Sequence, residues 1–125
     1  MPLVKIEIIK GKPQEYKKQL CDVVTEALDI SLSVPPEKLT QRVFELDWDA
    51  VSLPPDKSDK FILVEIVVFP GRDQALKKSA IVEITRLMVE RMGIPANDVY
   101  ILFQEQPKEN WGSGGLNAIE YTAPK

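Results

Sequence analysis

The sequence predicts an α/β protein built from two copies of one strand–helix–strand unit. Displacing the 125-residue chain by 60 positions aligns residues 4–43 with residues 64–103 without a gap, and eight of the 40 aligned pairs are identical. Apolar residues recur at every second position where strands are expected, and at helical spacing between them. Two such units predict a four-stranded mixed sheet with both helices on one face.

The first unit, about residues 2–46, begins with a strand. Residues 4–8 alternate between apolar and polar side chains, which is the pattern of a half-buried strand. Pro13 suits the first position of the following helix, where its missing N–H costs nothing. The expected apolar stripe of this helix is Tyr16, Leu20, Val23, Val24, Ala27 and Leu28. The second strand is expected at Thr40–Leu46.

The second unit, about residues 61–105, follows a polar linker at residues 47–60 that contains adjacent prolines. Its first strand is apolar, and Asp73 can cap the helix that comes next. The apolar stripe of that helix is Leu76, Ala80, Ile84, Leu87 and Met88. The last strand of the sheet is expected at residues 99–104.

The remaining residues form a tail, 106–125, that completes one domain spanning residues 1–125. A glycine-rich run at residues 112–115 lacks the lysine, the preceding strand and the following helix of a phosphate-binding loop. It therefore predicts a flexible connection, and a short final strand is expected near Ala118–Tyr121.

The sheet is expected to be apolar on the face that the helices leave open. Leu63, Val67 and Phe69 fall on this face, and residues 99–103 are apolar on both sides of their strand. Two helices cannot cover both faces of such a sheet, so another subunit is expected to cover the second one. The alternative is that the tail folds back over it.

Composition limits the classes of function. The chain is 44% hydrophobic and 28% charged, which is typical of a globular domain, and its net charge of −3 argues against nucleic-acid binding. No apolar stretch approaches the roughly 18 residues of a membrane span, and the N-terminus does not resemble a signal peptide, so a cytoplasmic location is expected. One cysteine excludes an internal disulfide, and the absence of histidine excludes Ser-His-Asp catalysis and histidine-ligated zinc.

Several short motifs occur in a fixed order around the duplicated unit. They are Met1-Pro2, Gly71-Arg72-Asp73-Gln74, Gly93-Ile94-Pro95, Glu109-Asn110-Trp111-Gly112 and Gly114-Gly115. In this order they resemble the tautomerase superfamily, and in particular its longer branch with fused repeats, which contains malonate semialdehyde decarboxylase and cis-3-chloroacrylic acid dehalogenase. The resemblance covers nearly the whole chain. It implies a homotrimer whose active sites use an amino-terminal proline and require no cofactor or metal.

Pro2 is the candidate general base. After removal of Met1 its nitrogen is a secondary amine, and an α-amino group titrates near about 7.7–8.0 unless apolar surroundings lower its pKa. Such a base can take a proton from a carbon next to a carbonyl and return it elsewhere, which is keto–enol isomerisation. With Met1 retained, the nitrogen is an amide without basicity. The structural alternative is an ordinary proline in an edge strand.

Arg72 is the second candidate catalytic residue. It precedes a helix N-terminus, where backbone N–H groups favour anions. Its guanidinium could hold a substrate carboxylate through two hydrogen bonds and stabilise an enolate as it forms. The alternative is a surface arginine paired with Asp73 or Glu65.

Trp111, Phe69 and Lys38 are the candidate substrate-binding residues. Trp111 could form an apolar wall, or it could simply belong to the core. The resemblance places a second arginine at Phe69 or Pro70, and an aspartate that positions water at Lys38. Lys38 could supply the missing positive charge, or it could be an exposed lysine in a proline turn.

The leading expectation is a tautomerase-like isomerase that acts on a small keto or enol acid. A decarboxylase-like or dehalogenase-like lyase on the same scaffold is the first alternative, and the missing arginine and carboxylate count against it. A trimeric binding protein without activity is the second alternative.

Overall fold

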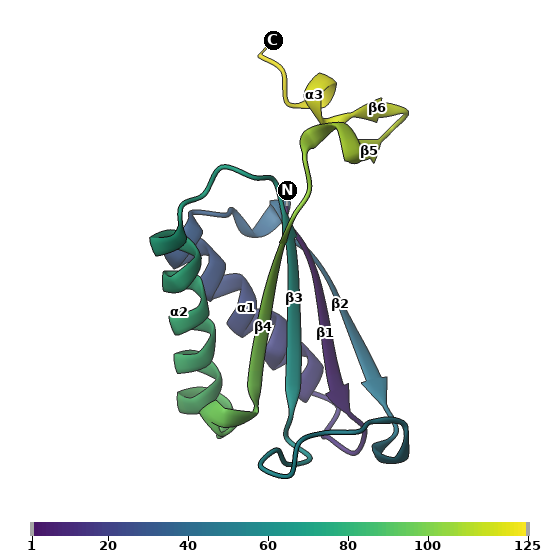
Figure 1. Ribbon diagram of the computed structural model, residues 1–125, viewed down its shortest axis with the longest axis vertical. Coiled ribbons are helices and arrows are strands. Elements are labelled where there is room, and N and C mark those ends of the chain that lie inside the picture. The colour runs from purple at the N-terminus through teal and green to yellow at the C-terminus, as the bar shows by residue number, and fades with distance from the viewer. Residues whose placement is uncertain (1, 125) are drawn as a thin grey trace.

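The computed structural model describes residues 2–124, and in it one four-stranded sheet carries two long helices on a single face (Figure 1). The main elements are β1 (Leu3–Ile9), α1 (Tyr16–Leu32), β2 (Thr40–Leu46), β3 (Ile62–Val68), α2 (Gln74–Met92) and β4 (Val99–Glu105). The sheet order is β2-β1-β3-β4, with parallel outer pairs and an antiparallel central pair. The predicted mixed sheet, with both helices on one side, is confirmed.

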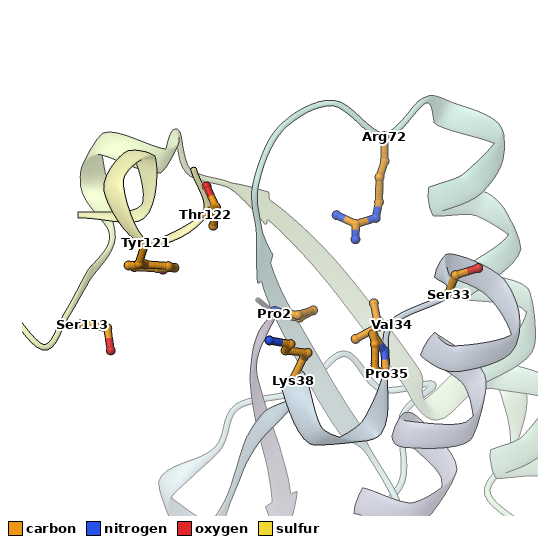
Figure 2. Close-up of a pocket in the computed structure, with 9 residues that line it drawn as sticks. All are labelled: Pro2, Ser33, Val34, Pro35, Lys38, Arg72, Ser113, Tyr121 and Thr122. Atoms are coloured by element: carbon orange, nitrogen blue, oxygen red, sulfur yellow. The ribbon is translucent and has the colours of Figure 1, made fainter. Parts of the chain in front are cut away.

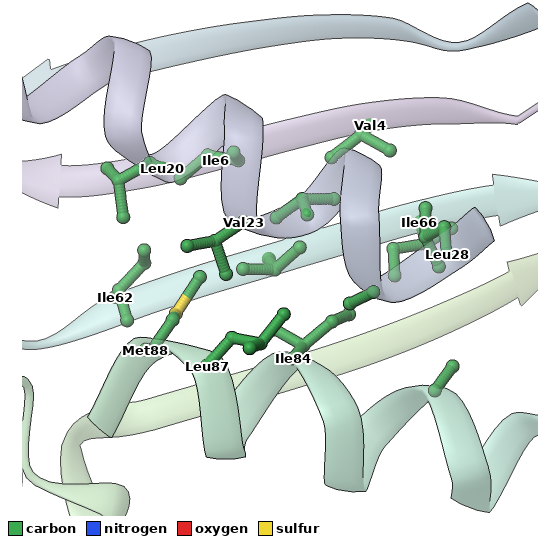
Figure 3. Close-up of a cluster of buried hydrophobic side chains, with 14 of the residues drawn as sticks. Val4, Ile6, Leu20, Val23, Leu28, Ile62, Ile66, Ile84, Leu87 and Met88 are labelled. Carbon is green, nitrogen blue, oxygen red and sulfur yellow. The ribbon is translucent and has the colours of Figure 1, made fainter. Parts of the chain in front are cut away.

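The core lies between the sheet and the helices (Figure 3). In β1 the residues Val4, Ile6 and Ile8 are almost fully buried, while the residues between them are only half-buried on the other face. This alternation places one apolar row under the helices. The stripes of α1 and α2 close over that row, and the most buried members are Leu20, Val24, Leu28, Ile84 and Met88.

The two helices begin differently. The backbone N–H of Leu76 donates to the Asp73 carboxylate at 2.9 Å, so Asp73 caps α2 as predicted. The expectation that Pro13 is the first residue of α1 is wrong. The Pro13 carbonyl instead accepts from the N–H of Tyr16 at 3.0 Å, which closes a turn ahead of the helix.

The tail also departs from expectation. A short hairpin pairs β5 (Gly112–Ser113) with β6 (Leu116–Asn117), and α3 (Ala118–Tyr121) follows directly. The predicted strand near Ala118–Tyr121 is therefore wrong, since the final strand lies just before it. The physical reason is a capping box: the Asn117 side chain accepts from the N–H of Glu120, and the Glu120 side chain accepts from the N–H of Asn117.

The tail does not cover the open face of the sheet. Figure 1 shows it projecting past the end of β4, at the same end of the sheet as the N-terminus. Phe44, Tyr100 and Leu102 remain 43%, 57% and 46% exposed. In the part of the chain that the structure describes, no helix is long and apolar enough to cross a lipid bilayer.

Candidate active site

A cleft of about 590 Å³ lies at the end of the sheet where β1 begins (Figure 2). Three of the five predicted site residues line it: Pro2, Lys38 and Arg72. They come from three segments that are distant in the sequence, namely the start of β1, the turn before β2 and the loop before α2. The topology brings these segments together because all three lie at the same end of the sheet.

Pro2 sits on the helix side of the sheet, where its environment is apolar. It is buried, and its carbonyl accepts from the N–H of Thr40 at 3.4 Å, which continues the pairing of β1 with β2. Val34 and Pro35 line the cleft beside it. Met1, whose removal would free the Pro2 amine, lies outside the described residues. The site thus places the candidate base against apolar side chains, which disfavour the charged form of an amine.

Lys38 reaches the cleft from a single turn of 3-10 helix, Pro36–Lys38. Its backbone N–H donates to the Pro35 carbonyl at 2.9 Å, which fixes this turn. Thr40, which bonds to the carbonyl of Pro2, is only two residues further along the chain. The local backbone therefore holds Lys38 close to the start of β1, with its side chain exposed to solvent.

Arg72 is half-buried and points its guanidinium into the cleft above Pro2 (Figure 2). It follows Gly71, whose φ of 124° is a conformation that residues with a side chain rarely adopt. The ion pairs among residues 2–124 do not include Arg72. The suggested surface pairing with Asp73 is not formed, because that carboxylate caps α2.

The cleft is positively charged, although the whole chain is acidic. Among the described residues that line it, Lys38 and Arg72 are cationic and none is an aspartate or glutamate. The net charge of the chain is −3. Two cations beside an apolar patch suit a small organic anion, and a guanidinium that forms no ion pair within residues 2–124 is free to donate hydrogen bonds to a carboxylate.

Phe69 and Trp111 are not brought into the cleft. The two rings pack edge-on, with centroids 5.1 Å apart, and the Trp111 indole N–H donates to the Gln106 carbonyl at 3.1 Å. The Lys108 ammonium lies 5.4 Å from the Phe69 ring. These contacts anchor the start of the tail, next to the end of β4. Their predicted role in substrate binding stays a prediction.

The tail supplies one wall of the cleft, which was not predicted from the sequence. Ser113, Tyr121 and Thr122 form this wall. The Thr122 hydroxyl donates to the Ala118 carbonyl at 2.5 Å and accepts from the Lys108 ammonium at 3.0 Å, which ties α3 to the preceding turn. The spacing of Asn117 and Glu120, which form the capping box, was the available signal for this helix.

The linker packs against the opposite end of the sheet, where the duplication places the equivalent positions. In the alignment displaced by 60 residues, Pro2 corresponds to Ile62, Arg72 to Lys12, and Lys38 to Asp98. The Lys12 ammonium donates to the Asp59 carbonyl at 2.8 Å, and the buried Asp98 carboxylate accepts from the N–H and hydroxyl of Ser58 at 2.9 and 2.6 Å. Ile62 lies inside the chain and has no terminal amine. The counterpart residues at this end are therefore engaged by the linker, whereas Pro2, Lys38 and Arg72 line an open cleft.

No cluster that could hold a metal ion is found among residues 2–124. The functional groups that line the cleft are the Arg72 guanidinium, the Lys38 ammonium and hydroxyl groups, together with Pro2, whose nitrogen is an amine once Met1 is removed. A neutral amine in an apolar setting can move a proton, and the cations can stabilise negative charge that develops on an oxygen.

Comparison with known proteins gives the family. Two family models, both described as tautomerase enzyme, match residues 38–114 and 2–47. The 2-hydroxymuconate tautomerase of Pseudomonas putida is 41% identical over 56 residues, which are 45% of this chain and 89% of that enzyme.

Solved structures share the complete fold. A wild-type fused 4-OT that forms a symmetric trimer has a TM-score of 0.85 and 20% identity, covering 97% of this chain and 99% of its own. A malonate semialdehyde decarboxylase has a TM-score of 0.84 and 22% identity, covering 96% of both chains. Because one family model spans more than half of the sequence, the chain belongs to the tautomerase family, and it is a tautomerase-like isomerase.

Proposed function

We propose that this enzyme interconverts the enol and keto forms of a small carboxylic acid, with the Pro2 amine as the general base. The observation that carries the proposal is that Pro2 and Arg72 line one cleft, which has apolar walls and no acidic side chain among its described residues. The base and the anion-binding group thus face the same bound molecule.

In the proposed reaction the substrate carboxylate binds the Arg72 guanidinium through two hydrogen bonds. The neutral Pro2 amine takes the proton of the enol hydroxyl, and the proline ammonium then delivers a proton to the neighbouring carbon of the double bond. The carbon–carbon double bond becomes single as the carbonyl forms, and no proton is gained or lost overall. The reverse sequence converts keto to enol.

The acid class is supported by the relatives as well as by the cleft. The Pseudomonas putida relative is named for 2-hydroxymuconate, which is an enol acid. A cleft of about 590 Å³ is large enough for an acid of this size. The two cations in its wall favour an anionic substrate over a neutral ketone.

Lyase chemistry has weaker support. A malonate semialdehyde decarboxylase shares the fold, but at 22% identity that likeness concerns the fold alone. Phe69 and Pro70 stand where a second arginine was expected from the resemblance, and Phe69 is engaged by Trp111. A single arginine favours simple proton transfer.

The experiment compares wild-type protein with Pro2→Ala, both freed of Met1 and checked by mass spectrometry, on phenylenolpyruvate. Alanine keeps a primary amine but loses the ring that fixes the position of the nitrogen. A misplaced base should lose most of the roughly hundredfold that general acid–base catalysis contributes, so kcat/KM of Pro2→Ala should fall by about that factor. Pro13→Ala, in the turn before α1, is the matched control and should keep full activity. Equal rates for wild type and Pro2→Ala would reject Pro2 as the base.

We also propose that the protein is a homotrimer. The proposal is supported by the open sheet face, on which Phe44, Tyr100 and Leu102 remain exposed and which the tail does not cover. The fused 4-OT of the same fold is a trimer. Light scattering should give about three times the 14.1 kDa mass of the chain, and a monomer at micromolar concentration would contradict the proposal.

A further inference from the structure

We propose that Lys38 keeps the Pro2 amine in its neutral, basic form by holding a positive charge beside it. Lys38 thus acts as a positioning residue that works through the base, and the inference rests on the proposed role of Pro2. In this role Lys38 transfers no proton itself and acts only on the protonation of Pro2.

The geometry places the two groups in one space. Lys38 and Pro2 both line the cleft, and Figure 2 shows the lysine side chain running along the proline ring with its amine toward the tail. The backbone fixes this arrangement, because the turn that carries Lys38 is closed by the Pro35 carbonyl and leads directly to Thr40, which bonds to the Pro2 carbonyl.

No described acid in the cleft cancels the charge of Lys38. Its ammonium takes part in none of the ion pairs found in residues 2–124. The other titratable or charged groups that face the cleft are Arg72, from the loop before α2, and Tyr121, from α3. The neighbouring Glu37 is exposed and does not line the cleft.

Two acids on the neighbouring elements α2 and β4 are engaged elsewhere. Asp73 accepts from the N–H of Leu76 and caps α2. Glu105, at the end of β4, pairs with Lys77 at 3.5 Å. Neither carboxylate lines the cleft. The charged side chains that line the cleft beside Pro2 are therefore both cations, Lys38 and Arg72.

The two cations differ once substrate is bound. The Arg72 charge is then largely offset by the substrate carboxylate, whereas Lys38 keeps its charge. A positive charge near an amine disfavours the ammonium form and lowers the amine pKa. A unit charge that shares a solvent-open cleft with an amine shifts the amine titration by roughly half to one pH unit. Near neutral pH, such a shift changes the fraction of active base severalfold.

The test is a charge series at one position, Lys38→Arg, Lys38→Gln and Lys38→Glu, in protein freed of Met1. An NMR titration of the Pro2 amine nitrogen reads the base directly, without substrate. The amine pKa should stay unchanged in Lys38→Arg, rise by roughly half to one pH unit in Lys38→Gln, and rise further in Lys38→Glu. Lys60→Gln, which changes an exposed linker lysine, is the matched control and should leave the titration unchanged.

Enzyme kinetics give the second readout. The rising limb of the kcat/KM profile should move to higher pH in Lys38→Gln, by the same amount as the amine titration, while the plateau at high pH is kept. An unchanged amine pKa in Lys38→Gln would overturn the inference. So would a pH-independent rise in KM confined to substrates with a second carboxylate, since that result would make Lys38 an anion-binding residue.

The two proposals fail in different ways. If Pro2→Ala keeps wild-type activity, the proposed base is wrong whatever the Lys38 series shows. If Pro2 is essential but its amine titrates identically across the series, only the role of Lys38 is refuted.

Discussion

Replacing Arg72 with alanine should weaken catalysis on acid substrates without unfolding the protein. Arg72 is half-buried in the cleft wall, and no described carboxylate pairs with it, so its loss breaks no ion pair. The Arg72→Ala substitution should therefore change the free energy of unfolding by no more than about 0.5 kcal/mol. A hydrogen bond to a charged group in a sheltered site is worth about 1.5–3 kcal/mol, which predicts a roughly ten- to hundredfold loss in kcat/KM.

The assay separates binding from chemistry. If Arg72 holds the carboxylate equally in the ground and transition states, KM should rise alone, and if it also stabilises the enolate, kcat should fall too. Arg72→Lys should rescue poorly, because a point charge cannot reproduce a two-pronged contact. The loss of kcat/KM in Arg72→Ala should be much smaller with a neutral ketone as substrate than with an acid. Comparable losses on both substrates would refute the carboxylate clamp.

Three further predictions concern the scaffold. Asp98→Ala should lower the free energy of unfolding by about 1–3 kcal/mol in urea, because it removes two hydrogen bonds that Ser58 donates to a buried carboxylate. The exposed Asp56→Ala should leave the midpoint nearly unchanged, and equal midpoints for the two variants would show that the linker contact is dispensable. Leu102→Glu places a charge on the open sheet face and should dissociate the trimer in a sedimentation experiment. Val82→Glu, at a position on α2 that is 48% exposed, should leave the trimer intact. The reverse result would place the interface on the helices. Burial and, to a smaller extent, Asp22 raise the pKa of the Cys21 thiol. Because the thiolate is the reactive form, thiol labelling of Cys21 near pH 8 should be slower than labelling of free cysteine, and an equal rate would contradict this.

Periodicity and local signals predicted most of the fold. The strand at Thr40–Leu46 and the cap at Asp73 were found from the sequence because each depends on residues close together in the chain. The start of α1 was misplaced because Pro13 can also close a turn through its carbonyl. The helix at Ala118–Tyr121 was missed because a four-residue segment has no periodicity of its own.

The candidate site was only partly predictable. Pro2, Lys38 and Arg72 could be grouped because the topology brings their segments to one end of the sheet. The contribution of Ser113 and Tyr121 could not be predicted, because it depends on where the tail leaves the sheet. That direction is fixed by long-range aromatic packing, which a single sequence does not specify.

The central claim is that a free Pro2 amine is the base, and removal of Met1 tests it most directly. One preparation that retains Met1 is treated with methionine aminopeptidase, and tautomerase activity is followed together with the mass of the chain. Activity should be nearly absent at first, since an amide nitrogen is not basic, and should rise in proportion to the fraction of chains that lose Met1. Full activity before any Met1 is removed would contradict the account.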